Sequence, residues 1–429
     1  MPIARSRALL LFAAATTAAL ALATPAAAAA TSFSSASSSA AARKLLDHDV
    51  ASFRAIEDGG AHNALDPARD VGDQTRATTC LPRDDFVRAN GALFELGGKP
   101  FAFAGWNQWE VLEAASDAPP PFRHLPLPGR EHVVRLMNEA SAPGVWNEDI
   151  LRGMDFVMDQ ARARGLKIIW ALADNWYPVG GIDQYVEWSP TASRHRDFFT
   201  DALAIRFFRD SFETIANRVN TYNGIAYKDD ATIMAWNLAN EARCQRCDSS
   251  VMQARYRWIE DTCAAFKEID PNHLVGIGYE GFYGPDSGHV DLNPNGGGSD
   301  WASKEGQDFI PNSAVDCIDY VGIHVWPDNW NFLGTEFQKK FIREHVDDVR
   351  RSIPGKPFVL EEFGNIVAKD DAEENRENAK GGRETKTRDA YFNSAFEVAE
   401  VRLGPSGSGS RLPFTLLSSV SLSPPSRSN

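Results

Sequence analysis

Short apolar runs alternate with amphipathic stretches along the chain from about residue 86 onward. The runs at 166–176, 232–241 and 357–364 are almost continuously apolar before they reach polar residues. They predict strands covered on both faces. Between them, apolar residues recur every three to four positions, as in helices that pack on a sheet. Repeated alternation of strand and helix predicts an α/β protein with a parallel sheet.

Capping residues and glycines set the limits of the predicted elements. Asn147 is a helix N-cap and Gly165 a helix stop, and Gly97-Gly98 is the turn of a hairpin before the first strand, 101–106. The other predicted strands are 166–176, 232–241, 273–281, 317–326 and 357–364. The predicted helices are 130–140, 147–164, 201–220, 250–268, 335–353 and 389–403. The buried face of helix 201–220 is expected to carry Phe208, Phe212, Ile215 and Val219.

The predicted strands end in polar or aromatic residues. These ends are Asn107, Asp174-Asn175, Asn240-Glu241, Glu280, His324 and Glu362. Functional residues of a (β/α)8 TIM barrel lie at the carboxyl ends of its strands. A doubly wound sheet is expected to have a Gly-rich phosphate turn after its first strand, and "GWNQWE" contains none. The pattern favours the barrel.

The ends of the chain differ from its centre. Residues 1–30 carry Arg5 and Arg7, an apolar stretch and then small residues, which predicts a secretory signal peptide and an extracellular or cell-wall location. An uncleaved anchor and a plastid transit peptide are the alternatives. Residues 31–85 read as a polar, disordered linker, 86–403 as the catalytic barrel, and 404–429 as a Ser/Pro-rich tail.

Composition narrows the partners. The 429 residues are 43% hydrophobic and 24% charged, with a net charge of −14, which fits a soluble protein and argues against nucleic acid or an anionic membrane as partner. The 11 Trp suit either a core or a carbohydrate groove. Cys244 and Cys247 form a C-x-x-C that is weak as a zinc site and favours a short-loop disulfide. No metal or cofactor is predicted.

Glu241 and Glu362 are the candidate catalytic pair, 121 positions apart at two strand ends. In a barrel, strands four and seven face each other across the mouth. A retaining glycosidase needs two carboxyls about 5–5.5 Å apart, and its acid needs a raised pKa, which burial beside a second carboxylate would supply. The alternative is that each Glu caps a helix or pairs with an Arg.

Several motifs resemble family 5 glycoside hydrolases of the endo-β-mannanase branch. "YKDDATIMAWNLANEARC" resembles the fourth-strand signature, "KPFVLEEFG" the seventh-strand nucleophile motif, and "GIHVWPDNW" the sixth-strand motif. "LADNWYPVGGIDQYVEW", "HRDFFTD" and "GIGYEGFYG" match further stretches of the branch. The resemblance spans about residues 86–403 and keeps the motifs in order.

The resemblance implies a role for each matching residue. Glu241 is the acid/base, Glu362 the nucleophile, and Asn240 binds the sugar 2-hydroxyl. His324 lines the site, and Trp326 stands where many members have an orienting Tyr. Candidates for stacking on mannose rings are Trp106, Trp176 and Trp330, with packing between loop and barrel as the alternative for each.

The implied activity is retaining hydrolysis of internal β-1,4-mannosidic bonds in mannan, glucomannan or galactomannan, by a monomer. A catalytically impaired mannan-binding homologue and a β-1,4-glucanase are the alternatives.

Two departures from the family pattern make the predicted barrel incomplete. The family has a second strand with an Arg near the nucleophile, yet only about five residues separate the helices that end near Ser141 and begin near Asn147. The family's eighth strand ends in an active-site Trp, whereas "LPFTLLSSVSL" carries Ser there and the last Trp is Trp330. Two explanations remain open: an imperfect gene model, or a degenerate homologue.

Overall fold

The computed structural model describes residues 8–14, 19–23, 85–107, 142–176, 181–245, 247–294, 300–330, 333–364, 383–403 and 415–419. All of them belong to a unit formed by residues 1–25 and 80–429. The predicted helix at 130–140 lies outside the described residues.

A small antiparallel sheet precedes the main sheet. It consists of β3 (Arg88–Asn90), β4 (Leu93–Leu96) and β5 (Lys99–Phe101). Gly97 and Gly98 connect β4 to β5 with φ values of 59° and 69°, which confirms the predicted turn, because both residues adopt a conformation that favours glycine. Phe94 and Phe101 pack with residues at the amino ends of the main strands, among them Met234 and Val359. The small sheet therefore covers the end opposite the polar strand ends.

The main sheet is built from parallel strands that follow the predicted order. These strands are β6 (Phe103–Asn107), β7 (Leu166–Ala171), β8 (Ile233–Asn237), β9 (Leu274–Gly276), β10 (Val321–Val325), β11 (Phe358–Phe363) and β12 (Thr415–Ser419). β12 pairs with both β11 and β6. Asp319 N–H, just before β10, donates to Val275 O of β9 at 2.8 Å. This bond joins the two outer strands of the order β10-β11-β12-β6-β2-β1-β7-β8-β9.

The place between β6 and β7 is filled from the N-terminus. The described stretch 142–147, before the next helix, contains no strand. β1 (Ala8–Ala14) and β2 (Ala19–Ala23) lie there instead, and β1 pairs in parallel with both β6 and β7. In the full chain, the segment predicted as a signal peptide therefore lies next to two strands of the main sheet.

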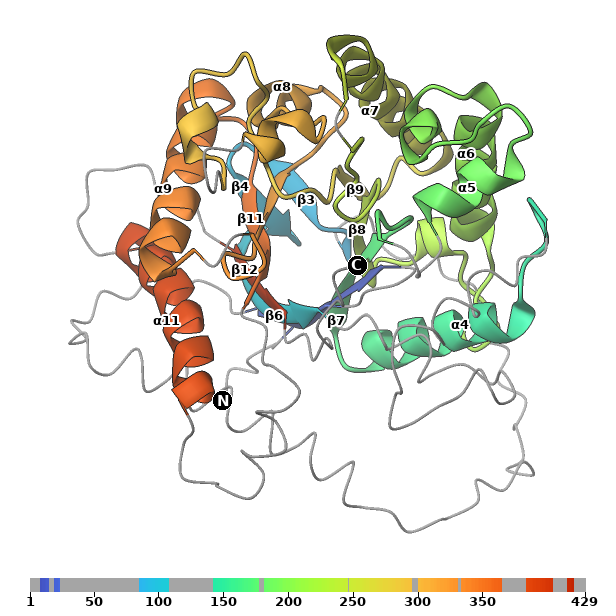
Figure 1. Cartoon of the computed structure of the whole chain (residues 1–429). Coiled ribbons are helices and arrows are strands. Elements are labelled where there is room, and N and C mark those ends of the chain that lie inside the picture. Colours follow the sequence, from blue (N-terminus) through green and yellow to red (C-terminus); the bar gives the residue numbers. More distant parts are fainter. Residues whose placement is uncertain are drawn as a thin grey trace, which may run out of the picture. The chain divides into compact units, whose positions relative to one another are not determined.

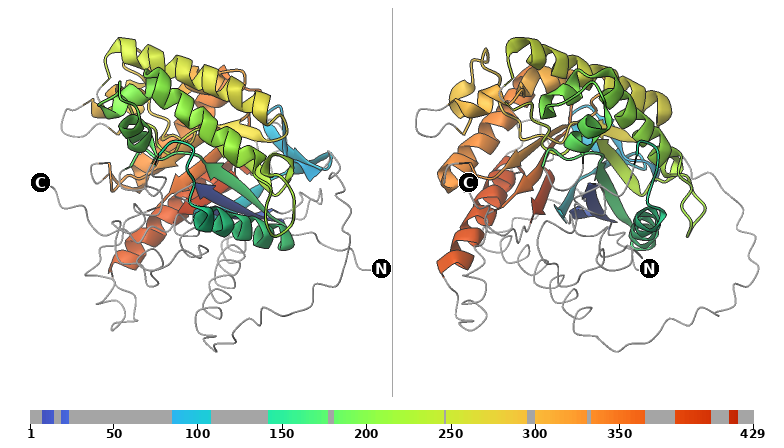
Figure 2. Two further views of the ribbon diagram at one scale, coloured as in Figure 1. Left: turned by 90° about the vertical axis from the view of Figure 1, so that its right-hand side faces the viewer. Right: turned by 45° about the vertical axis from the view of Figure 1, so that its right-hand side comes forward.

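Helices cover the outside of the curved sheet (Figure 1). They are α4 (Glu148–Ala163), α5 (Ile182–Trp188), α6 (Ala202–Asn217), α7 (Ser249–Ile269), α8 (Phe309–Ala314), α9 (Thr335–Ser352) and α11 (Arg383–Leu403). The long helices α6 and α7 run side by side (Figure 2). Asn147 caps α4 through its side-chain oxygen, as predicted. The sequence pattern did not indicate the short helices α5 and α8.

The predicted buried face of α6 is right for three of its four residues. Phe208, Phe212 and Ile215 are buried, and Phe212 stacks on Phe266 of α7 with ring centroids 3.7 Å apart. Val219 was predicted wrongly: α6 ends at Asn217, and Val219 is 56% exposed. Apolar spacing alone continued the predicted helix to residue 220, three residues beyond Asn217.

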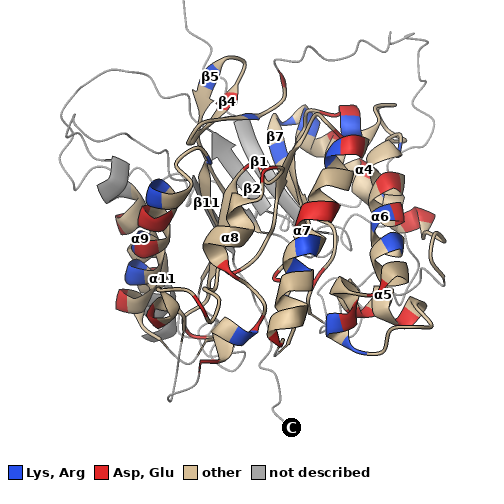
Figure 3. Cartoon of the chain, turned by 90° about the horizontal axis from the view of Figure 1, so that it is seen from above, with Lys and Arg blue, Asp and Glu red and all other residues tan. Residues whose placement is uncertain are grey.

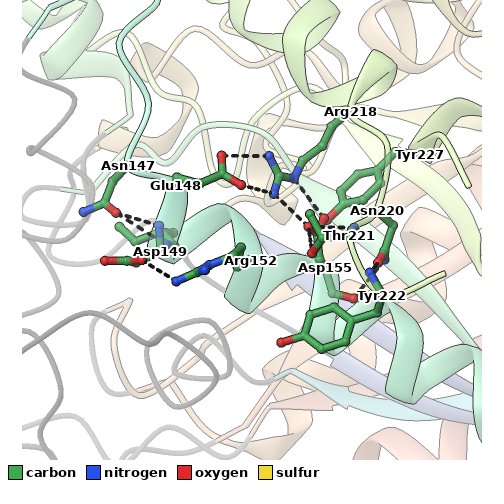
Figure 4. A network of polar contacts seen from close by, with 11 residues as sticks. Asn147, Glu148, Asp149, Arg152, Asp155, Arg218, Asn220, Thr221, Tyr222 and Tyr227 are labelled. Carbon is green, nitrogen blue, oxygen red and sulfur yellow. Dashed lines mark hydrogen bonds and ion pairs between the residues drawn. The ribbon is translucent and has the colours of Figure 1, made fainter. Parts of the chain in front are cut away.

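Charged residues of both signs lie along the outer faces of α4, α6, α7 and α9 (Figure 3). Arg218 ties its loop to α4: it donates to the buried Asp155 and to the exposed Glu148, with distances of 2.7–3.1 Å (Figure 4). Thr221 and Tyr227 also donate to Asp155. Among the described residues, no helix is long and apolar enough to cross a membrane.

Two disulfides tie loops to this frame. Cys244 and Cys247 are bonded to each other, as the sequence favoured. Cys263 of α7 is bonded to Cys317, which lies before β10. Cys80 lies outside the described residues.

Candidate active site

The two candidate carboxylates come together at the carboxyl ends of β8 and β11. Glu362 lies within β11, and Glu241 follows β8 by four residues. Glu241, Glu362 and His324 of β10 each offer a ligand atom within 4.8 Å of the others. Both carboxylates are 7% exposed. A separation of about 5 Å is the one that retaining glycosidases use.

The backbone at Glu241 is held in an unusual conformation. Its φ is 50°, in the left-handed region that non-glycine residues rarely adopt. Glu241 N–H donates to Gly278 O at 2.6 Å, and Asn240 N–H donates to Ala173 O at 2.8 Å. Contacts to two neighbouring strand ends therefore fix a conformation that is intrinsically unfavourable, as is common at functional sites.

Asn240 is buried next to Glu241 with one polar atom left over. Its Nδ2 donates to Asp174 Oδ2 at 3.0 Å. Its Oδ1 has no hydrogen-bond partner among the described residues, although the side chain is only 6% exposed. A buried, unpaired acceptor is costly unless a ligand or water satisfies it.

His324 lies between the carboxylates and is fully buried. Its Nδ1 hydrogen-bonds Glu241 Oε1 at 2.9 Å and is 3.7 Å from Glu362 Oε2. Burial lowers the pKa of His324, but the charge of Glu362, the hydrogen bond to Glu241 and the carboxylate of Glu361, 3.8 Å from Nε2, raise it well above its usual value. The raised pKa favours the imidazolium form of the ring, which offsets part of the negative charge of the two carboxylates.

The two carboxylates titrate differently. Burial raises the pKa of Glu362 to about 7, helped by the charge of Glu241 and opposed by that of His324. Burial also acts to raise the pKa of Glu241, but the hydrogen bond and charge of His324 and the charge of Arg243 outweigh it and lower that pKa. The expected raised pKa of the acid/base is therefore wrong for the free protein, because His324 bonds Glu241 rather than Glu362.

Trp326 and Trp176 each donate to one of the carboxylates. Trp326 Nε1 donates to Glu362 Oε2 at 3.1 Å, and the side chain is buried. The indole N–H therefore supplies a hydrogen-bond donor to Glu362. Trp176 Nε1 donates to Glu241 Oε2 at 2.6 Å, and Trp176 is 41% exposed. Trp176 thus combines a bond to Glu241 with an accessible ring surface.

The other two Trp candidates differ from Trp176. Trp106 lies in β6, but the structure does not describe its side chain. Trp330 is 4% exposed and packs edge-on against Phe282 and tilted against Phe341, with ring centroids 5.2 and 5.5 Å away. Trp330 is thus a core residue in this structure, and its contacts favour packing over stacking.

Sequence reasoning missed a polar floor beneath the two carboxylates. Glu361 is fully buried, and its Oε1 accepts from Asn237 Nδ2 at 2.8 Å and Tyr320 Oη at 3.0 Å. Asn107 Nδ2 donates to Glu361 O at 3.1 Å. A charged residue inside a buried strand almost always has polar partners, so Glu361 was a signal that the sequence offered.

Arg243 was also missed. It forms an ion pair with the fully buried Glu280 at 2.6 Å. Its guanidinium lies over the rings of Trp176, Trp301 and Phe282, 4.9–5.3 Å from their centroids. Burial raises the pKa of Glu280, against the lowering effect of the Arg243 charge. The signal was Glu280: the sequence identified it as a strand end, but did not predict that Arg243 pairs with it.

Glu241, His324 and Glu362 are also the group of described residues best placed to hold a metal. The hydrogen bond between His324 and Glu241 already explains their proximity, and a glycosidase pair needs no metal. A separate cavity of about 360 Å³ lies beside the small sheet, lined by Phe86, Arg88, Glu95, Gly97, Gly98, Pro271 and Asn272. It contains none of the site residues.

Comparison with known proteins gives consistent relatives. Residues 129–408 match the model of the GH family 5 beta-mannosidase-like family. The chain is 35% identical over 324 residues to mannan endo-1,4-beta-mannosidase 7 of Arabidopsis thaliana, covering 68% of this chain and 71% of that protein. It is 33% identical over 359 residues to putative mannan endo-1,4-beta-mannosidase 9 of Oryza sativa subsp. japonica, covering 76% and 80%.

Solved structures agree on the fold. The hyperthermostable endo-1,4-beta-D-mannanase of Thermotoga petrophila RKU-1 has a TM-score of 0.51 and 27% identity, covering 65% of this chain and 73% of that chain. The endo-1,4-beta-mannanase of Rhizomucor miehei has a TM-score of 0.53 and 23% identity, covering 78% and 90%. The likeness confirms the (β/α)8 barrel class predicted from strand order. The family model spans well over half of the sequence, and the chain therefore belongs to the glycoside hydrolase family 5 beta-mannosidase-like family.

Proposed function

We propose that the protein is an endo-β-1,4-mannanase that cleaves internal mannosidic bonds with retention of configuration. The observation that carries the proposal is the placement of Glu241 and Glu362 within 4.8 Å at the carboxyl ends of β8 and β11. The names of the relatives, mannan endo-1,4-beta-mannosidases, support mannan as the substrate class.

The reaction takes two steps. In the first, Glu362 attacks the anomeric carbon while Glu241 gives its proton to the glycosidic oxygen, so that the carbon–oxygen bond breaks and a glycosyl ester forms on Glu362. In the second, Glu241 takes a proton from water, and the hydroxide attacks the same carbon and releases Glu362. Two inversions return the original configuration.

Catalysis needs the proton on Glu241, whereas the free protein favours it on Glu362. The two carboxylates titrate as a coupled pair, so substrate contacts must shift the proton from Glu362 to Glu241. A glycosidic oxygen beside Glu241 accepts a hydrogen bond from the protonated form. Positive charge developing at the anomeric carbon favours ionised Glu362, which the imidazolium of His324 also stabilises.

Three further residues have proposed roles in binding. Asn240 Oδ1, buried and without a partner among the described residues, accepts a hydrogen bond from the sugar 2-hydroxyl. The exposed ring of Trp176 offers a stacking face beside Glu241. Trp106 is the third residue, with stacking on a mannose ring as its proposed role. It belongs to β6, whose last residue, Asn107, donates to the backbone of Glu361.

The N-terminal segment has two proposed states. Its charge pattern supports a secretory signal and action outside the cell or in the cell wall, with a plastid as the alternative. In the unprocessed chain, β1 fills the second strand position of the barrel. Edman sequencing of the purified native protein distinguishes them. A start near residue 31 means that the working barrel lacks β1, and a start at or before Ala8 means that it keeps β1.

Incubation with galactomannan, with reducing ends counted over time, tests the proposed activity. Turnover is expected from the wild type and from the control Glu213→Ala, whose side chain is exposed on α6. Glu362→Ala is expected to lose all measurable turnover. Saturable binding of mannan by the wild type without turnover would instead identify a mannan-binding homologue. Faster initial cleavage of cellohexaose than of mannohexaose would identify a β-1,4-glucanase.

A further inference from the structure

Gln307 is a fully buried side chain next to the active site that no step of the proposed reaction uses. It lies in the connection before α8 and reaches the loop after β9. Its Oε1 accepts from two backbone groups, Gly281 N–H at 3.0 Å and Phe282 N–H at 3.1 Å. Its Nε2 donates to Glu280 Oε2. The amide therefore fixes both the turn after Glu280 and the carboxylate itself.

Glu280 passes this constraint to Arg243. Its Oε1 accepts from Arg243 Nε at 2.7 Å and lies 2.6 Å from a terminal nitrogen of the same guanidinium. Both oxygens of Glu280 are thus occupied, one by the amide and one by the guanidinium. Since Glu280 is fully buried, neither bond can be replaced by bulk solvent.

Arg243 connects this pair to the catalytic acid. Its guanidinium lies 4.9 Å from the centroid of the Trp176 ring and 5.1 Å from that of Trp301. Trp176 in turn donates its indole N–H to Glu241 at 2.6 Å. If the guanidinium were displaced, Glu241 would lose a nearby positive charge. The Trp176 ring, whose N–H bonds Glu241, would also lose the cation that lies over it.

We propose that Gln307 is a positioning residue of the active site, whose amide orients Glu280 so that Glu280 holds Arg243 against Trp176 beside Glu241. The inference rests on the proposed function, which gives Glu241 its role as acid/base. An amide is the group that fits, because one oxygen must accept two N–H groups while the nitrogen donates to a carboxylate. A hydrocarbon side chain would leave all three partners unsatisfied.

The surrounding charges require that this side chain be neutral. Glu280 faces Arg243, Glu241 and His324, and Glu241 faces His324, Arg243 and Glu362. Two cationic groups, Arg243 and His324, are thus shared by three carboxylates: Glu241, Glu280 and Glu362. A further negative charge at position 307 would compete for Arg243 directly.

Gln307→Glu tests the proposal through its pH dependence. At about pH 4.5 the introduced carboxyl holds a proton and donates to Glu280 as the amide does, so kcat/KM on mannohexaose is expected to stay within about twofold of wild type. As that proton is lost toward pH 7, the two carboxylates repel each other and draw Arg243 away from Trp176. The ratio of variant to wild-type kcat/KM is then expected to fall about tenfold or more.

Gln338→Glu is the matched control. Gln338 of α9 is another fully buried glutamine, and its Nε2 donates to Tyr391 O and Ser394 Oγ, neither of which belongs to the active site. The Gln338→Glu substitution makes the same chemical change as Gln307→Glu and has the same cost of burying a carboxyl group. Its ratio to wild-type kcat/KM is expected to stay flat with pH. A Gln307→Glu ratio that is equally flat would overturn the proposal.

A crystal structure of Gln307→Met decides the same point without any activity. The guanidinium of Arg243 is expected to leave the Trp176 ring when the amide is lost. An Arg243 that keeps both its Glu280 pair and its place over Trp176 would overturn the proposal. If the wild type cleaves no mannan, the proposed function fails, whereas this structure still decides whether Gln307 positions Arg243.

Discussion

Replacing Glu362 by Gln is expected to stabilise the folded protein while removing its activity. The pKa of Glu362 is about 7 in the folded state, against an ordinary value of 4.5. The fold therefore favours the protonated form, and the stability linked to that proton is full below pH 4.5 and lost as the pH rises through 7. A difference of about 2.5 in pKa corresponds to about 3 kcal/mol in the free energy of unfolding. Glutamine has no proton to lose, so the variant avoids this loss.

The expected signature is a stability difference that grows with pH. At pH 8, Glu362→Gln should unfold at a Tm about 5 °C above wild type for a chain of this size, and the difference should shrink toward zero at pH 4.5. Calorimetry across pH 4.5–8 measures it, because both proteins can be scanned in matched buffers.

Glu241→Gln supplies a control of opposite sign. Hydrogen bonding and charge from His324 lower the pKa of Glu241 against the effect of burial, so its ionised form contributes stability that is present above the ordinary pKa. Its replacement should therefore lower Tm at pH 8. The reasoning is refuted if both variants move Tm in the same direction at pH 8, or if the gain from Glu362→Gln is undiminished at pH 4.5.

Two further substitutions test single contacts. Trp326→Phe removes the 3.1 Å donor to Glu362 and is expected to lower kcat about tenfold and move the acid limb of the pH–kcat profile upward, whereas Trp326→Tyr, which keeps a donor, should recover most of the rate. Asp155→Asn breaks the buried pair with Arg218 and should lower the free energy of unfolding in urea by about 3 kcal/mol. Its kcat/KM at 25 °C should match wild type, and a large loss of kcat/KM would contradict a purely structural role.

The fold was predictable because the buried parallel strands of a barrel appear in the sequence as separate apolar runs. The predicted strand at 357–364 became β11, and the predicted helix at 335–353 became α9 within a residue at either end. The prediction errors arose where the local sequence pattern does not determine the structure. Apolar spacing ran through Val219, although the chain leaves α6 at Asn217. Nothing local indicated that residues 8–14 would pair with β6 and β7, since that pairing joins segments about 95 and 157 positions apart.

The site divides in the same way between what a strand end reveals and what only contact reveals. Glu241, His324 and Glu362 were identifiable because each ends or follows an apolar strand, and the structure places them within 4.8 Å. Which carboxylate holds the proton was not identifiable, because it depends on a 2.9 Å bond from His324 to one of them and a 3.7 Å gap to the other. A difference of less than 1 Å thus reverses the expected order of the two pKa values. The sequence determines which groups meet in the barrel mouth, and the packing of His324 between them determines which carboxylate holds the proton.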